Sequence, residues 1–182
     1  TWLSTYFHAT RDISSETAGS MASAVMVLAI VGAPLGGIIT DRWRRTNIRA
    51  RLLFPTITSV LSAIFLLIAL WMTSGTLQYV FFLLMGVTVT AFVPAAAAVT
   101  QDVIHAGMRA MSYAVAVVVQ NLLGASTAPL VIGRLYDLYD IKTAMALLPF
   151  MLILGAILFY AGSRFYEKDL NKTVKVKLVA EE

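Results

Sequence analysis

The stretch "LLFPTITSVLSAIFLLIALWMTSGTLQYVFFLLMGVTVTAFVPAAAAVTQ", residues 52–101, contains no Asp, Glu, Lys or Arg in 50 positions. A helix needs about 20 apolar residues to cross the hydrocarbon core of a bilayer, so this run is long enough for two crossings. A turn-forming polar cluster, "TSGT" at residues 73–76, divides it near the middle. The stretch therefore predicts two membrane-spanning helices joined by a short connection.

Three further charge-free runs lie on either side of this stretch, at residues 17–40, 110–133 and 143–163. None has the polar alternation of a barrel strand, and a helix is the other element that satisfies its own backbone in lipid. We therefore predict an all-α, polytopic membrane helix bundle. Its five spans are expected near residues 20–39, 52–71, 77–99, 110–132 and 143–162.

The composition supports a membrane protein over a soluble bundle of buried helices. Hydrophobic residues make up 59% of the 182-residue chain and charged residues 13%, with a mean hydropathy of +0.79. A soluble domain has roughly 25% charged residues, so this chain could not cover a water-exposed surface. The net charge of +4 does not indicate a nucleic-acid partner, because the basic residues lie between apolar runs.

The basic residues also predict an orientation. Five crossings place residues 41–51, residues 100–109 and the chain after 162 on one side, which carries 11 of the 14 Lys and Arg residues. Lys and Arg gather on the cytoplasmic side of spanning helices. We therefore expect an integral protein of the inner or plasma membrane, with a membrane domain at residues 1–165 and a cytoplasmic tail at residues 166–182.

The chain opens on "TWLSTYF", residues 1–7. Aromatic residues gather at the membrane–water interface. We expect Trp2, Tyr6 and Phe7 to form such a belt at the outer end of an earlier helix. The bundle would then hold five spanning helices plus the end of a sixth, as in the second part of a longer membrane protein.

An arginine-rich loop follows the first span, and its start, "GIITDRWRR" at residues 37–45, resembles the loop signature of the major facilitator superfamily. Gly37, Asp41, Arg42 and Arg45 match the pattern Gly-x-x-x-Asp-Arg/Lys-x-Gly-Arg-Arg/Lys, whereas Arg44 stands where glycine is usual. These transporters consist of two six-helix halves. The resemblance implies the C-terminal half, from the end of helix seven through helix twelve, with the N-terminal half as partner.

That resemblance also implies a function and a gate. The function is secondary active transport of a small organic solute, by symport or antiport with alternating access. In the family, the aspartate of the loop helps to close the cytoplasmic face. We expect Asp41 to do so here, with Arg42 and Arg45 holding its carboxylate in place.

A second segment, "QNLLGASTAPLVIGRLYD" at residues 120–137, is similar to the eleventh helix of the spinster-like branch of the family. Members of that branch export lipids or amphipathic organic anions. The aspartate that usually follows Leu-Leu-Gly in that branch is replaced here by Ala125.

Uncharged polar residues inside the spans are candidates for the substrate cavity. Tyr113, Gln120 and Thr127 recur at intervals of seven with Asn121 adjacent, so a regular helix would present them as one stripe. Thr88 on the third span is a weaker candidate. The alternative is that these groups hydrogen-bond to neighbouring helices and only stabilise packing. Close packing is also the expected role of the Gly-x-x-x-Gly pair at positions 32 and 36.

The sequence offers little for catalysis. His8 and His105 are expected on opposite sides of the membrane, and no ionisable residue lies within a predicted span. We therefore expect no enzyme activity, no metal site and no cofactor. The expected partners are the lipid bilayer and a small-molecule substrate, without nucleic acid. The competing class is a non-transporting membrane module, receptor-like or for assembly, which solute flux by the intact protein would distinguish.

Overall fold

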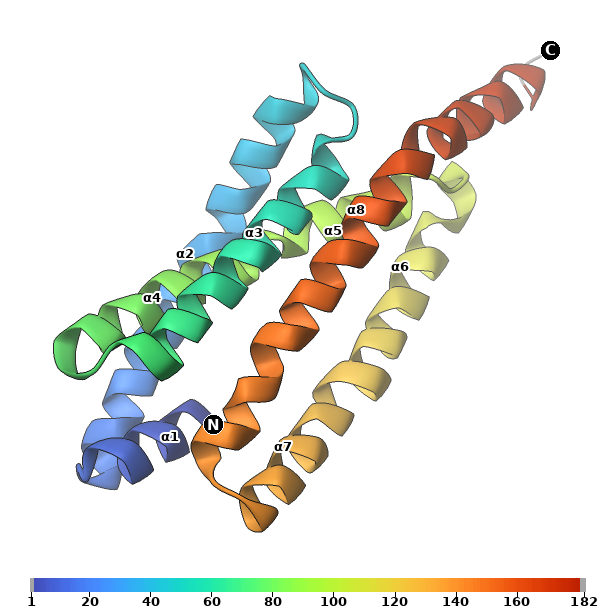
Figure 1. Ribbon diagram of the computed structural model, residues 1–182. Coiled ribbons are helices and arrows are strands. Elements are labelled where there is room, and N and C mark those ends of the chain that lie inside the picture. Colours follow the sequence, from blue (N-terminus) through green and yellow to red (C-terminus); the bar gives the residue numbers. More distant parts are fainter. Residues whose placement is uncertain (1, 181–182) are drawn as a thin grey trace.

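The computed structural model describes residues 2–180, and helices dominate it, with no strand among these residues (Figure 1). A short helix, α1 (Trp2–Arg11), precedes five helices that are long and apolar enough to cross a membrane. Each of the five contains one predicted span. Their bounds are Ser15–Arg44, Ala50–Met72, Gly75–Asp102, Arg109–Leu138 and Ile141–Lys172. The predicted all-α membrane bundle is confirmed.

Several spans are built from more than one helical element. The second joins α3 (Ala50–Leu67) to a π-helical turn, η1 (Ile68–Met72), and the third joins α4 (Gly75–Ala91) to α5 (Val93–Asp102). After a 3-10 turn, η2 (Ala106–Met108), the fourth consists of α6 (Arg109–Val119), a second π-helical turn, η3 (Gln120–Ala125), and α7 (Thr127–Leu138). The first and last spans are the single helices α2 (Ser15–Arg44) and α8 (Ile141–Ala180).

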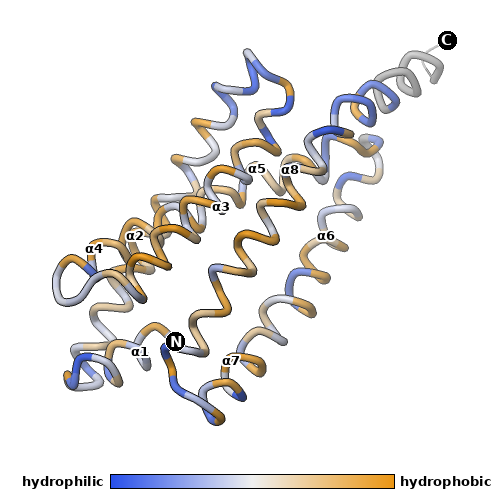
Figure 2. Tube along the Cα trace, viewed as in Figure 1, coloured by the Kyte–Doolittle hydropathy of each residue, from blue (hydrophilic) through white to orange (hydrophobic). Residues whose placement is uncertain are grey.

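The helices pack in a sequence that differs from their order in the chain. Helix α2 packs on α4, α4 on α3, and α3 on α8, whereas α6 contacts α5 and α7 contacts α8 (Figure 1). Polar residues collect at the two ends of the bundle, and apolar residues fill its length (Figure 2). One end contains the α2–α3 and α5–α6 connections, and the other contains the α1–α2 and α7–α8 connections (Figure 1).

An aromatic cluster forms part of the core near α1. Tyr6 is 1% exposed and Phe7 is not exposed, and both rings pack edge-on against Phe82 at centroid distances of 5.5 and 5.2 Å. The prediction that Tyr6 and Phe7 belong to an interfacial belt is therefore wrong. Edge-to-face packing inside the bundle removes these large rings from solvent, and that burial outweighs an interfacial position. Trp2 packs on Tyr136 of α7, with ring centroids 6.2 Å apart.

The α2–α4 interface is closely packed through glycine. A Cβ atom at Gly36 would lie 2.0 Å from the Ala91 carbonyl oxygen, and one at Gly32 would lie 2.1 Å from the Val87 carbonyl oxygen. Thr90 Oγ1 donates a hydrogen bond to the Ala29 carbonyl oxygen across this interface at 2.6 Å. The predicted close-packing role of the Gly-x-x-x-Gly pair is confirmed.

Helix α8 continues through the predicted start of the tail. It runs unbroken for 40 residues, and Tyr166 is only 2% exposed because it packs back on the bundle. The predicted cytoplasmic tail begins at residue 166. In the structure, this part of the chain extends the last spanning helix.

Candidate functional site

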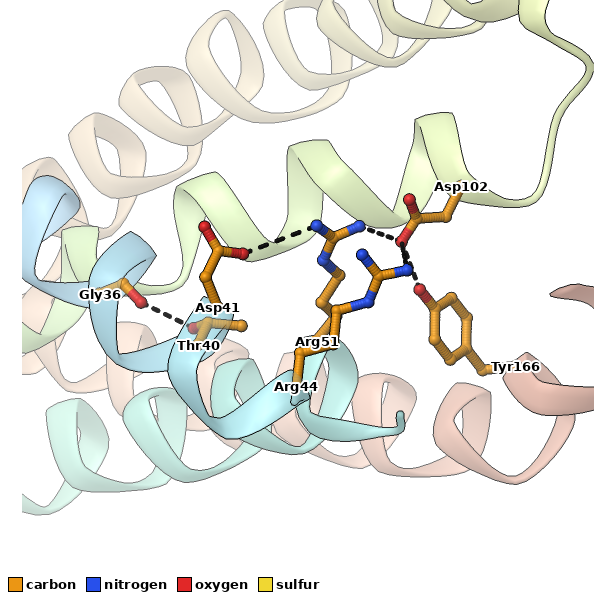
Figure 3. A network of polar contacts seen from close by, with 7 residues as sticks. All are labelled: Gly36, Thr40, Asp41, Arg44, Arg51, Asp102 and Tyr166. Carbon is orange, nitrogen blue, oxygen red and sulfur yellow. Dashed lines mark hydrogen bonds and ion pairs between the residues drawn. The ribbon is translucent and has the colours of Figure 1, made fainter. Parts of the chain in front are cut away.

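A charged cluster joins four helices at the end of the bundle that carries the arginine-rich loop (Figure 3). At its centre is Asp102, the last residue of α5. Asp102 Oδ2 accepts a hydrogen bond from Arg51 Nη1 of α3 and one from Tyr166 Oη of α8, the latter at 2.5 Å. Arg44 Nη2, at the end of α2, lies 3.4 Å from the same oxygen. A single carboxylate thus links α2, α3, α5 and α8.

The cluster is largely withdrawn from solvent at its centre and exposed at one edge. The side chains of Arg51 and Asp102 are 14% and 17% exposed, and that of Arg44 is 32% exposed. Arg51 Nη2 also lies 3.6 Å from Asp41 Oδ1, whose side chain is 69% exposed. Arg51 therefore bridges a sheltered carboxylate and an exposed one. Asp41 remains accessible to a group outside the described residues.

The four residues of the gate motif have different surroundings in the structure. Gly37 faces Pro94 of α5, where a Cβ atom would be 3.6 Å away. Among the described residues, the ion pair of Asp41 is with Arg51, and Arg42 and Arg45 are exposed. The expectation that Arg42 and Arg45 hold the carboxylate is therefore wrong. Helix α2 ends at Arg44, and the start of α3 brings Arg51 back to the face on which Asp41 lies.

A pocket of about 310 Å³ lies between α5 and α6. It contains Tyr113 and Gln120, two of the predicted cavity residues, together with Thr100 of α5. The remaining lining is apolar, and the full set is Phe92, Val93, Ala96, Ala97, Thr100, Tyr113, Ala116, Val117 and Gln120.

The other predicted cavity residues do not line this pocket. In η3, Ser126 N donates to the Asn121 carbonyl oxygen at 2.9 Å, a bond that spans five residues. A π turn inserts one residue, so later positions rotate by about 100° relative to a regular helix. This rotation separates Thr127 from the stripe of Tyr113 and Gln120. The Asn121 and Thr127 side chains donate to the carbonyl oxygens of Val117 and Leu123.

Thr88 lies in a helix–helix contact. Ser62 Oγ of α3 donates to Thr88 Oγ1 of α4 at 2.8 Å. Thr88 also lies 3.0 Å from the Leu84 carbonyl oxygen on its own helix. This geometry corresponds to the alternative role, in which a polar side chain joins two neighbouring helices.

The fourth span is the least covered part of the bundle. No residue of α6 or η3 is buried, and in α7 Ile132 is the buried residue, at 4% exposure. The pocket between α5 and α6 therefore lies beside a helix with a long exposed face.

Comparison with known proteins decides the family. The family model of the Major Facilitator Superfamily matches residues 1–180. The chain belongs to the major facilitator superfamily. Members of this superfamily are membrane transporters rather than enzymes. No curated protein matches the sequence.

Within this major facilitator chain, sequence reasoning missed three residues of the charged cluster, namely Arg51, Asp102 and Tyr166. Two of them carried a readable signal, because Arg51 and Asp102 directly bracket the 50-residue charge-free run. Two crossings return the chain to the same side of the membrane, so the two ends of the run lie close together. Tyr166 had no comparable signal, because only the packing of α8 on α3 brings it there.

Proposed function

We propose that this major facilitator chain is the C-terminal half of a secondary transporter that moves a small organic solute by alternating access. Helices α1 to α8 then correspond to the end of helix seven through helix twelve, and an N-terminal half completes the transporter. The observation that carries this proposal is the α5–α6 pocket with Tyr113 and Gln120 on its wall. Substrate sites in two-half transporters lie between the halves, and the exposed face of α6 and α7 provides a surface for the second half.

The lining of the pocket supports a particular class of substrate. It offers a phenol, an amide and a hydroxyl group, from Tyr113, Gln120 and Thr100, within an otherwise apolar surface. Such a lining suits a solute with a large apolar body and a few hydrogen-bonding groups. An amphipathic organic anion or a lipid, as exported by the spinster-like branch, meets this description, with any counter-charge supplied by the other half.

The charged cluster then acts as part of a cytoplasmic gate. The positive-inside rule assigns this end, and with it the C-terminus, to the cytoplasm of an inner or plasma membrane. Asp41 is exposed, so its carboxylate can pair with a helix N-terminus of the other half, which carries about half a positive charge. The sheltered pair of Arg51 and Asp102 holds α3 and α5 in place behind it.

Cysteine accessibility in the intact transporter tests the proposed cavity, and the described chain contains no cysteine of its own. We expect a membrane-impermeant maleimide to label single cysteines at positions 113 and 120. Matched cysteines at Phe150 and Leu154, which are 62% and 51% exposed on α8, should react far more slowly because they face lipid. Equal labelling of the two pairs would contradict a water-filled cavity beside α6.

A further inference from the structure

A second charged feature lies beside the start of α3 and is separate from the Asp102 cluster. It is a cleft of about 510 Å³ between Arg49, just before α3, and the polar part of α8. Four cations, one carboxylate and one amide line it, namely Arg49, Arg164, Glu167, Lys168, Asn171 and Lys172. Neither Arg44 nor Arg51 lines this cleft, because their guanidinium groups are directed at Asp102.

Ion pairs neutralise only part of this charge. Arg49 Nη2 donates to Glu167 Oε2 at 2.9 Å, and both side chains are nearly half exposed. Lys172 Nζ lies 3.5 Å from Asp169 Oδ1 on its own helix. Arg164 lies over the Tyr160 ring, with Cζ 5.3 Å from the centroid, and its guanidinium has no ion pair with an acidic residue of the described chain. The cleft thus retains a positive charge that suits an anion.

The same face of α8 continues into an apolar stripe. Leu154, Ile157 and Leu158 are 51%, 58% and 65% exposed. Positions 154, 157, 161, 164 and 168 follow one another at spacings of three to four, so the stripe shares a helix face with Arg164 and Lys168. At a rise of 1.5 Å per residue, Ile157 and Lys168 are about 16 Å apart along the axis. One leaflet of the hydrocarbon core is about 15 Å thick. The distance from the apolar part of the stripe to its basic end therefore matches the thickness of one leaflet of the hydrocarbon core.

We propose that this cleft binds the phosphate-bearing headgroup of an anionic phospholipid whose acyl chains lie along the apolar stripe of α8. Guanidinium groups bind phosphate oxygens in a bidentate manner, and Lys168 adds a point charge. Basic pockets at the ends of spanning helices are suited to such headgroups. A soluble phosphate ester would use the basic residues alone, and the apolar stripe would then have no part in binding.

Glu167 sets the strength of the site. Its carboxylate competes with the headgroup for Arg49, since a phosphate that enters the cleft meets a guanidinium that is already paired. Replacing Glu167 by Gln releases Arg49 and removes the one negative charge of the lining. The site should then bind an anionic lipid more tightly. If this ion pair served only to hold α3 against α8, the substitution would instead weaken binding.

The test is lipid binding by the full-length protein, measured by native mass spectrometry with phosphatidylglycerol and phosphatidylcholine. The double variant Arg164→Gln/Lys168→Gln should bind phosphatidylglycerol about tenfold to thirtyfold more weakly, since each cation near the surface contributes about fivefold. The control Arg45→Gln/Arg109→Gln removes the same charge at the same end, outside the cleft, and should change binding less than threefold. Glu167→Gln should strengthen binding severalfold.

Four results would overturn the proposal. Equal weakening by the control variant would mean that diffuse surface charge attracts the lipid. Equal binding of phosphatidylcholine would remove the headgroup selectivity. Competition by glycerol phosphate at the concentration of the lipid would assign the cleft to a soluble phosphate ester. Unchanged binding by the cleft variant, eluting as a single folded species with its melting temperature preserved, would mean that the cleft is not the site.

Discussion

At the scale of single residues, Asp102 and Asp41 are two acids with the same neighbour and different surroundings. Both contact Arg51, but the side chain of Asp102 is 17% exposed and that of Asp41 is 69% exposed. A partly buried ion pair has lost its hydration, so removing one member leaves a costly unpaired charge. An exposed pair is worth about 0–1 kcal/mol. The two aspartates should therefore serve different purposes, one structural and one conformational.

We expect Asp102→Asn to destabilise the protein by about 2–4 kcal/mol, because it leaves Arg44 without its carboxylate partner and leaves the sheltered Arg51 with only the exposed carboxylate of Asp41, 3.6 Å away. Asp41→Asn should change the free energy of unfolding by less than about 1 kcal/mol. It should instead speed maleimide labelling of a cysteine at position 120 from the cytoplasmic side, because the proposed gate loses its charge. Thermal unfolding in detergent and labelling rates measure the two effects.

Equal melting temperatures for the two variants would show that Asp102 does not stabilise the bundle through this cluster. An unchanged labelling rate in Asp41→Asn would leave Asp41 as a residue of the helix end with no part in gating. Arg42→Gln is a suitable control for both measurements, because Arg42 is exposed and its loss also removes one charge at this end.

At the scale of helices, the α2–α4 contact depends on the absence of side chains. We expect Gly36→Ala to destabilise the protein by about 1–3 kcal/mol, because its methyl group would overlap the Ala91 carbonyl oxygen and push the helices apart. The adjacent variant Gly37→Ala is the matched control. Its methyl group would meet Pro94 at an ordinary contact distance of 3.6 Å, and alanine favours the helix by about 1 kcal/mol.

Size-exclusion chromatography after heating compares the two glycine variants directly. Gly36→Ala should leave the monodisperse peak at a lower temperature than the parent protein, and Gly37→Ala should leave it at the same or a higher one. Equal behaviour of the two variants would mean that α2 and α4 can separate without loss of stability.

How far the sequence predicted these helices depends on the kind of signal involved. The five spans follow from the charge-free runs, because the cost of burying charge in lipid is large and local in sequence. The register of Gln120 with Thr127 did not follow, because the prediction assumed a regular helix and the π turn at η3 shifts the later positions. The burial of Tyr6 and Phe7 was also missed, because an interfacial belt and an aromatic core share the same residue types.

At the scale of the whole molecule, one half of a two-half transporter should provide one wall of a pathway and no enclosed route. We expect no saturable solute uptake when the 182-residue chain alone is reconstituted in liposomes. The largely exposed fourth span, with Ile132 as the buried residue of α7, is the physical reason. Addition of an N-terminal half should restore uptake. Robust uptake by the 182 residues alone would contradict the half-transporter proposal.

The length of α8 gives it the properties of a lever. Its residues 141–172 span about 48 Å at 1.5 Å per residue, well beyond the roughly 30 Å of hydrocarbon that the helix crosses. Pro149 lies near one end and removes a backbone hydrogen bond there, which makes that point a natural fulcrum. A swing of about 10° at Pro149 displaces Tyr166, about 26 Å further along the axis, by about 4–5 Å. A small movement of the α7–α8 turn, on the short side of Pro149, therefore produces a larger movement of Tyr166 on the long side, which is enough to separate Tyr166 from Asp102.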